Sequence, residues 1–246
     1  MRASACRLAL AAVAGLAAVA PASAQSSPDS LGWHLTAAAG YVQTSGNSRL
    51  SSVNVGDKLL FRATHQWAFT QTASWVYGKN AGVESANQIL AGLRADYSFN
   101  PRVSLYALGA YERNRFAGIT SRYEEAAGVA WAAIRSTRQR LDVEVGIGSN
   151  QQRAPGAPVD NFWATRLAAK YRLNFTDKAY VEEAAELLSD LKEMHDQRVN
   201  SATALVAPLT ASIALRFGFD LRLDNQPVPG FKKTDTTFTS GIQLTL

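Results

Sequence analysis

The sequence predicts an all-β protein, a closed antiparallel transmembrane β-barrel of about twelve strands with short periplasmic turns and longer extracellular loops. Three observations lead to this prediction: an export leader, long strands that alternate between apolar and polar residues, and connections that alternate in length. Hydrophobic residues make up 47% of the 246 residues, which excludes a disordered chain because enough apolar surface can be buried. After residue 20, no run approaches the roughly 20 apolar residues that a membrane-spanning helix needs.

The N-terminal residues have the features of a cleavable secretory signal peptide. Arg2 and Arg7 form a positive start, residues 8–20 carry no charge, and Ala22-Ser23-Ala24 fits a cleavage site. We therefore expect a signal peptide at 1–24 and one barrel domain at 25–246, with an uncleaved membrane anchor as the alternative. The single cysteine, Cys6, lies in the leader, so the exported chain would lack a disulfide and a thiol ligand. The net charge of +5 includes both leader arginines, and the remaining surplus is too small to indicate a nucleic-acid partner.

Residues 211–224 show the clearest alternation. Every second residue from Ala211 to Leu223 is apolar, and the alternate residues from Ser212 to Asp224 include four charges. Residues 162–175 and 89–99 follow the same period of two, which is typical of β-strands with one apolar face. In a barrel that crosses a membrane, the apolar face meets lipid and the other face lines the interior. The charges predicted to face the barrel interior are Arg94, Asp96, Asp142, Glu144, Arg166, Lys170, Arg172, Arg216, Asp220 and Arg222.

Aromatic spacing favours a membrane barrel over a soluble sandwich. Between Trp67 and Tyr77 one face holds Trp67, Phe69, Trp75 and Tyr77, so that an aromatic residue stands at both ends of the strand. Ten residue steps of about 3.3 Å, tilted by about 40°, rise roughly 25 Å. This rise matches the apolar band between the two aromatic girdles of an outer-membrane barrel.

The connections predict the orientation of the barrel. Connections after even-numbered strands are short, whereas most of those after odd-numbered strands are longer, for example 78–84, 151–160 and 225–233. An even number of strands places both termini at the periplasmic side. The predicted strands are 33–44, 49–63, 67–77, 85–99, 103–115, 123–135, 141–150, 161–175, 179–189, 198–207, 211–224 and 234–246.

Two segments fit this pattern poorly. Residues 181–194 place Val181, Ala184, Leu188 and Leu191 at helical spacing, so a helix competes with a strand there; the strand count favours a strand at 179–189. Asp57 falls on the face that should meet lipid, unless a bulge at Gly56 turns it inward. The sequence leaves the orientation of Asp57 open.

The last seven residues resemble the C-terminal signal that the barrel-assembly machinery reads. Gly241, Leu244 and Leu246 occupy the glycine and apolar positions of that signal, although many barrels end in Phe. We therefore expect outer-membrane lipid and the barrel-assembly machinery as partners and the cell outer membrane as the location.

Three stretches resemble the YdiY-like, salt-induced outer-membrane protein family, a domain of unknown function. They are Ser45–Ser48 followed by Val53–Gly56, Tyr111–Phe116 followed by Arg122-Tyr123, and Asp224–Thr237. Family members usually have an aliphatic residue where Asp57 stands. The resemblance implies a barrel fold and an outer-membrane location, and it implies no agreed activity.

No constellation of residues indicates catalysis, so we predict no catalytic, cofactor-binding or metal-binding residues. The three histidines, His34, His65 and His195, fall at a strand end, in a short turn and in a long loop. His195-Asp196 could supply half of an acid–His pair, but exposed loop residues explain it more simply. No phosphate-binding or dinucleotide motif is present.

The function expected from these observations is a non-enzymatic outer-membrane barrel with a structural, stress-related or small-solute pore role. Interior charges of both signs are expected to pair and plug the barrel, since buried charges need partners. The competing interpretation is a selective pore, in which the basic excess of the interior favours anions. The remaining alternatives are a lipase- or protease-like barrel enzyme and a soluble exported β-protein.

Overall fold

The structure is a computed structural model that describes residues 30–43 and 50–246. The predicted signal peptide at 1–24 and the Ser45–Ser48 stretch lie outside these residues. Within 30–43 and 50–246, no helix is both long and apolar enough to cross a membrane.

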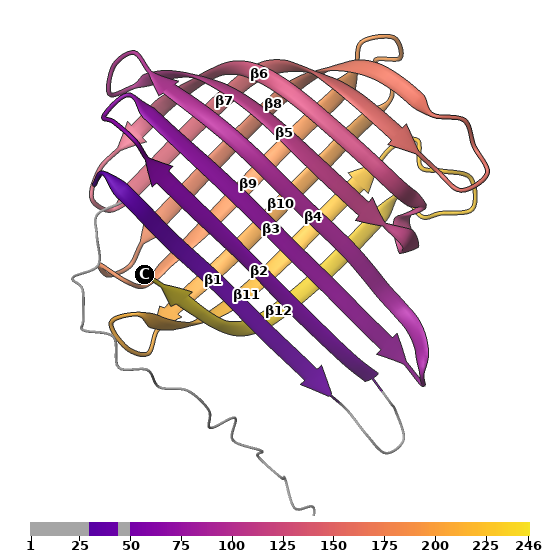
Figure 1. The fold of residues 1–246 in the computed structure, drawn as a ribbon, viewed down its shortest axis with the longest axis horizontal. Helices are drawn as coiled ribbons and strands as arrows, with labels where there is room; N and C mark the ends of the chain where they lie inside the picture. Colours follow the sequence, from indigo (N-terminus) through magenta and orange to yellow (C-terminus); the bar gives the residue numbers. More distant parts are fainter. Residues whose placement is uncertain (1–29, 44–49) are drawn as a thin grey trace, which may run out of the picture.

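Twelve antiparallel strands close into a barrel in which each strand pairs with its neighbours in sequence and β12 pairs with β1 (Figure 1). The predicted fold class and strand number are confirmed. A short 3-10 helix, η1 (Arg115–Ala117), connects β5 to β6. The strands are β1 (Gly32–Gln43), β2 (Leu50–Arg62), β3 (Trp67–Asn80), β4 (Val83–Ser98), β5 (Val103–Asn114), β6 (Ile119–Arg135), β7 (Gln139–Arg153), β8 (Asp160–Asn174), β9 (Tyr180–Asp190), β10 (Gln197–Pro208), β11 (Ile213–Asp224) and β12 (Thr234–Thr245).

The two ends of the barrel carry different connections. The turn end holds the C-terminus and the connections 63–66, 99–102, 136–138, 175–179 and 209–212; the loop end holds 81–82, 115–118, 154–159, 191–196 and 225–233. The predicted long loop at 78–84 is wrong, because β3 and β4 continue until they meet at Ala81-Gly82. Both residues have positive φ, 49° and 86°, as a tight two-residue hairpin requires.

The outer face carries two belts of aromatic side chains. Near the turn end, the rings of Trp33 and Phe61 stack with their centroids 4.2 Å apart, and Trp67 lies 5.0 Å from Tyr97. Nearer the loop end, Tyr111 and Tyr123 lie 5.1 Å apart. Apolar side chains fill the surface between the belts, as the period-two alternation predicted.

The segment with helical spacing is a strand. β9 (Tyr180–Asp190) pairs along its length with β8 and β10, and the residues after it form a loop. A helix here would leave the edges of β8 and β10 without partners, so ladder hydrogen bonds override the local periodicity. Leu188 is buried inside the barrel, whereas Leu187 lies on the outer face opposite Leu167.

Asp57 lies on the outer face. The β1–β2 and β2–β3 ladders run without a register shift through Gly56, so the bulge that could turn Asp57 inward does not form. Asp57 stands opposite Ala37 and Ala73 and has no hydrogen bond or ion pair with a described residue. By contrast, the outward Glu183 accepts hydrogen bonds from the hydroxyls of Ser201 and Thr203.

The seam that closes the barrel is short. β1 and β12 pair only from Thr36–Thr245 to Ala39–Ile242, whereas β1 pairs with β2 from Gly32 to Gln43. Leu246 extends the seam by two backbone hydrogen bonds with Leu35, at 2.8 and 3.0 Å. Closure of the barrel therefore depends strongly on the last few residues.

Candidate functional site

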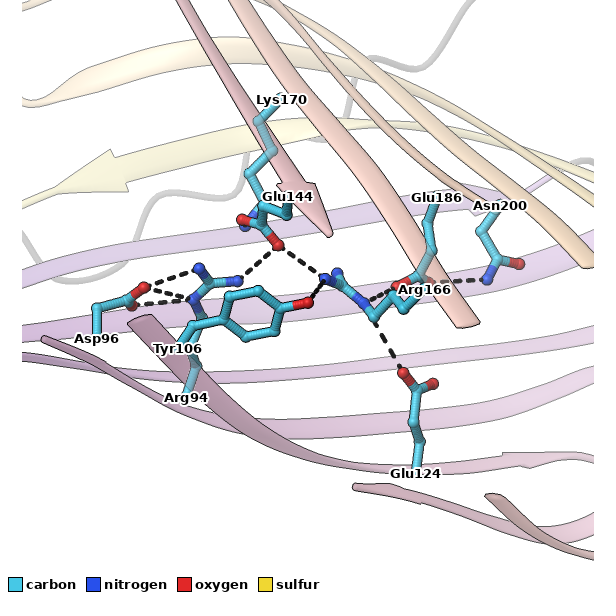
Figure 2. A network of polar contacts seen from close by, with 9 residues as sticks. All are labelled: Arg94, Asp96, Tyr106, Glu124, Glu144, Arg166, Lys170, Glu186 and Asn200. Carbon is cyan, nitrogen blue, oxygen red and sulfur yellow. Dashed lines mark hydrogen bonds and ion pairs between the residues drawn. The ribbon is translucent and has the colours of Figure 1, made fainter. Parts of the chain in front are cut away.

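The barrel interior holds a central network of charged and polar side chains, drawn in Figure 2. Its residues come from seven consecutive strands, β4 to β10, and each points away from the aromatic outer face. The members are Arg94, Asp96, Tyr106, Glu124, Glu144, Arg166, Lys170, Glu186 and Asn200.

Glu144 is the centre of this network. Its carboxylate accepts hydrogen bonds from Arg94 Nη1 at 2.9 Å, from Arg166 Nη1 at 2.8 Å and from Lys170 Nζ at 3.2 Å. The Glu144 side chain is only 2% exposed. A buried carboxylate needs such charged partners, because desolvation without them is expensive.

The two arginines connect further acids to the centre. Arg94 holds Asp96 on the same strand through Nε and Nη2, at distances between 2.7 and 3.0 Å. Arg166 Nε donates to Glu186 Oε1 at 2.5 Å and lies 3.9 Å from Glu124 Oε1. The network is therefore nearly neutral and internally paired.

Tyr106 lies between the two arginines. The centroid of its ring is 4.4 Å from Arg94 Cζ and 5.3 Å from Arg166 Cζ, within the range of cation–π attraction. The phenol lies over two glycines, Gly128 on β6 and Gly146 on β7. A Cβ at either position would collide with the hydroxyl oxygen. These glycines let the ring lie flat along the wall.

The interior is filled unevenly. Exposed inward side chains occur on two walls: Lys58 and Thr72 on β2 and β3, and Lys170, Ala184 and Ala202 on β8 to β10. β3 and β9 are six strands apart in a closed ring of twelve, so these walls face each other. A cavity of about 190 Å³ lies against the second wall, beside Lys170 and Ala184. Both walls therefore border accessible space inside the barrel.

Lys58, on β2, is an inward cation that lies outside the central network. It makes no hydrogen bond or ion pair with a residue in 30–43 or 50–246, and its side chain is exposed inside the barrel. The charges that act on it most strongly are Lys170, Glu182, Arg172 and Arg94. Three of these four groups are cations, so Lys58 lies among more positive than negative charges.

A second group of side chains lies nearer the turn end. Arg172 Cζ lies 3.4 Å from the ring centroid of Tyr180, and Arg172 Nε donates to Asn174 Oδ1 at 3.0 Å. Arg216 Nη1 lies 3.3 Å from Glu182 Oε1. These contacts leave Arg172 without an acidic partner in the described chain.

A third group, which we call the mouth cluster, lies at the loop end. It is a chain of alternating charges in which Glu112 bonds both Arg222 and Arg122, Asp224 lies near both Arg122 and Arg198, and Asp196 lies 3.9 Å from Arg198. Burial raises the pKa of the Asp196 carboxyl above its ordinary value, although Arg198 acts to lower it. The members are Glu112, Arg122, Asp196, Arg198, Arg222 and Asp224.

The structure separates the ten charges that the sequence predicted to face the interior. Five lie in the central network, Arg172 and Arg216 in the group near the turn end, and Arg222 in the mouth cluster. Asp142 and Asp220 were expected to pair with arginines; within 30–43 and 50–246 neither makes an ion pair.

The sequence analysis missed several inward charged residues that the same alternation would have placed inside the barrel. They are Lys58, Glu112, Arg122, Glu124, Glu182, Glu186 and Arg198.

Two of the three histidines make hydrogen bonds within the described chain. His34 Nε2 bonds the carbonyl oxygen of Ser30 at 2.9 Å, and His195 contributes its own carbonyl oxygen to Asn225. Among residues 30–43 and 50–246, no three His, Cys, Asp or Glu side chains gather in a way that could hold a metal ion.

The closed barrel, its aromatic belts and its polar interior define an outer-membrane type of barrel. Comparison with solved structures agrees. The NanC porin superposes with a TM-score of 0.54 at 10% identity, covering 87% of this chain and 100% of that one. The COG4313 outer membrane channel from Pseudomonas putida F1 superposes with a TM-score of 0.50 at 11% identity, covering 93% and 100%.

The sequence profile of the family described as "Protein of unknown function, DUF481" matches residues 37–245. The chain therefore belongs to that family, and the predicted membership in a domain family of unknown function is confirmed. A search of curated proteins found no significant match.

Proposed function

We propose that the protein is a pore of the cell outer membrane for small anionic solutes, with its turn end in the periplasm. One observation carries the proposal: Lys58 and Lys170 face the interior from opposite walls, and both side chains are exposed there. An exposed side chain inside a barrel is in contact with solvent space. The accessible space inside the barrel is therefore bordered by two ammonium groups.

The electrostatics of this space favour anions. Lys170 shares the carboxylate of Glu144 with two arginines, so the acid does not neutralise it fully. Lys58 and Arg172 have no acidic partner in the described chain, and Asp142 and Asp220 form no ion pair there either. The preference for anions is therefore inferred from the positions of Lys58 and Lys170 on the two walls. Cationic side chains that line a pore attract anions and repel cations. The porin and channel that share the fold add support for a transport role.

A plugged barrel with a structural or stress-related role is the second candidate. The observation that favours it is the burial of Arg166, whose residue is 6% exposed and whose guanidinium joins partners on several strands. If the network fills the barrel, the unaltered protein should pass little current, and replacement of Arg166 and Arg216 by Ala should raise it.

The test is the current through the purified full-length protein in a planar bilayer with a KCl gradient. We expect open channels with a reversal potential that indicates preference for chloride. The K58Q/K170Q variant should lose most of this preference, whereas K178Q, altered in a turn outside the barrel, should keep it. A silent wild type, or a cation-selective one, would overturn the proposal.

We further propose that the barrel-assembly machinery recognises the C-terminal segment with Gly241, Leu244 and Leu246. Leu244 and Leu246 lie at the end of the strand that closes the barrel, where Leu244 pairs with Ala37. Leu244 and Leu246 are 37% and 59% exposed. Binding of a peptide of residues 240–246 to the purified machinery, and its loss when both leucines become Ser, would test this.

A further inference from the structure

Two segments that are far apart in sequence meet over the loop end of the barrel. The connection 225–233 places the ring of Phe231 where a Cβ of Gly118 would stand, and Gly118 has φ of 72°. Asn114 caps η1 through hydrogen bonds to Phe116 N and Ala117 N. Both segments are stretches that carry the family resemblance. Their contact fixes the loop in place beside the mouth cluster.

The loop has further anchors on both sides. Asp224 N donates to Lys233 O at 2.8 Å, and Asn225 N donates to Gln197 O at 3.0 Å. Asn225 Nδ2 also donates to the carbonyl oxygen of His195 at 2.6 Å. The two lysines at the end of the loop, Lys232 and Lys233, are therefore held at the mouth.

A cavity of about 40 Å³ lies beneath this loop. More cationic than acidic side chains line the cavity. The cations are Arg122, Arg198, Arg222, Lys232 and Lys233, and the acids are Glu112, Asp224 and Asp235. Glu112 already bonds two arginines, and Asp224 lies 3.4 Å from Arg198 and 3.9 Å from Arg122. Glu112 and Asp224 are thus each shared between two arginines, and the lining of the cavity keeps an excess of positive charge.

Arg198 has one buried donor without an acceptor in the described chain. The residue is 6% exposed, and its guanidinium lies over the ring of Phe162, with Cζ 4.8 Å from the centroid. Its Nε lies 3.4 Å from Asp224 Oδ2, whereas its buried Nη1 has no partner among the described residues. Buried donors in native proteins nearly always have an acceptor. An acceptor at this cavity is therefore expected to come from a bound group.

We propose that the mouth cavity binds the carboxylate or phosphate group of a solute, with Arg198 as the buried donor and Lys232 and Lys233 closing over it. A guanidinium presents parallel N–H donors that match the oxygens of these groups. The cavity is small, about 40 Å³, so we expect only the anionic group of a solute to enter it, while the rest of the solute lies in the mouth. This inference rests on the proposed anion pore and gives it an entry site.

The test is titration calorimetry of the detergent-solubilised full-length protein with inorganic phosphate and, separately, with acetate. We expect saturable binding of at least one anion. K232Q/K233Q should weaken it tenfold or more without disturbing the barrel, and R198Q should abolish it. K192Q, altered in a neighbouring loop away from the cavity, should bind like the wild type.

Absence of saturable binding, or binding that K232Q/K233Q leaves unchanged, would overturn the inference. If R198Q fails to fold, the lysine variant still decides the question. Bilayer currents separate this inference from the pore proposal. Chloride-selective current without phosphate or acetate binding would remove the entry site and keep the pore, whereas binding without current would keep the site and remove the pore.

Discussion

The hydroxyl oxygen of Tyr106 on β5 accepts a hydrogen bond from Nη1 of Arg166 on β8 at 3.0 Å, across the two intervening strands of the barrel wall. The same nitrogen donates to Glu144 at 2.8 Å. Tyr106 therefore holds the guanidinium against the wall.

Replacing Tyr106 by Phe should lower the free energy of unfolding by about 1.5 kcal/mol. This is the low end for a hydrogen bond to a charged group, and Arg166 keeps its bond to Glu144. Urea unfolding in lipid vesicles measures the change. Y123F is the control, because Tyr123 is 50% exposed on the outer face. Equal stabilities of the two variants would show that the Tyr106 bond contributes nothing.

Gly146→Ala should be destabilising by roughly 1–3 kcal/mol, since the new methyl group would collide with the Tyr106 hydroxyl and with the backbone oxygen of Ala127. Gly109→Ala is the matched control: it lies on β5 and has no atom within 4 Å of the added carbon. We expect Gly109→Ala to leave stability the same or raise it slightly. A harmless Gly146→Ala would mean that the phenol can move without cost.

Ala185 and Ala184 are neighbours on β9 that face opposite sides of the wall. Ala185 lies on the outer face opposite Ala169, whereas Ala184 is inward and exposed to the interior. Ala185→Arg should cost about 2–4 kcal/mol of stability in vesicles, because its charge enters lipid. Ala184→Arg should fold normally and change channel current instead. Equal refolding of both variants would contradict the assignment of faces.

Asp57→Val should raise the free energy of unfolding in vesicles by up to about 2 kcal/mol. A carboxylate in contact with lipid costs somewhat less than the roughly 2–4 kcal/mol of a lysine or arginine. Asp177→Val, in a turn at the barrel end, is the control and should change little. A loss of stability on Asp57→Val would reveal that the carboxylate has a partner in the membrane.

Deleting Leu244–Leu246 should prevent closure of the barrel. The deletion removes two of the four seam pairs and both hydrogen bonds between Leu246 and Leu35. We expect the protein to be degraded or to remain in the periplasm, with no heat-modifiable band on gels. Deleting Ala157 from the loop 154–159 is the control and should leave assembly intact. Normal membrane levels of the truncated protein would show that the seam is dispensable.

Much of the fold was predictable because a strand has a period of two. The alternation from Ala211 to Leu223 identified both faces of β11, and the strand boundaries of the twelve predicted segments lie close to those observed. The loops at 78–84 and 116–122 were predicted too long. Polar residues there belong to strands that continue beyond the aromatic belt, where the outer face no longer meets lipid.

The segment 181–194 shows the limit of local pattern. Its apolar residues fit a helix, yet the chain forms β9, because only pairing with β8 and β10 satisfies the backbone groups on both sides. The sequence of this segment does not contain that information. That information lies in the neighbouring strands β8 and β10. The sequence analysis reached the correct assignment only through the need for an even number of strands.

By itself, the sequence determined which face turns inward in the strands with clear alternation, such as residues 211–224, because successive side chains must point to opposite sides. It could not determine which inward residues meet. Arg222 reaches Glu112 across 110 positions of sequence, and Arg166 reaches Tyr106 across 60. These pairings depend on the stagger of tilted strands around a closed ring, a property of the whole barrel. The accessible space beside Lys58 and the mouth cluster were therefore decided by the tertiary structure.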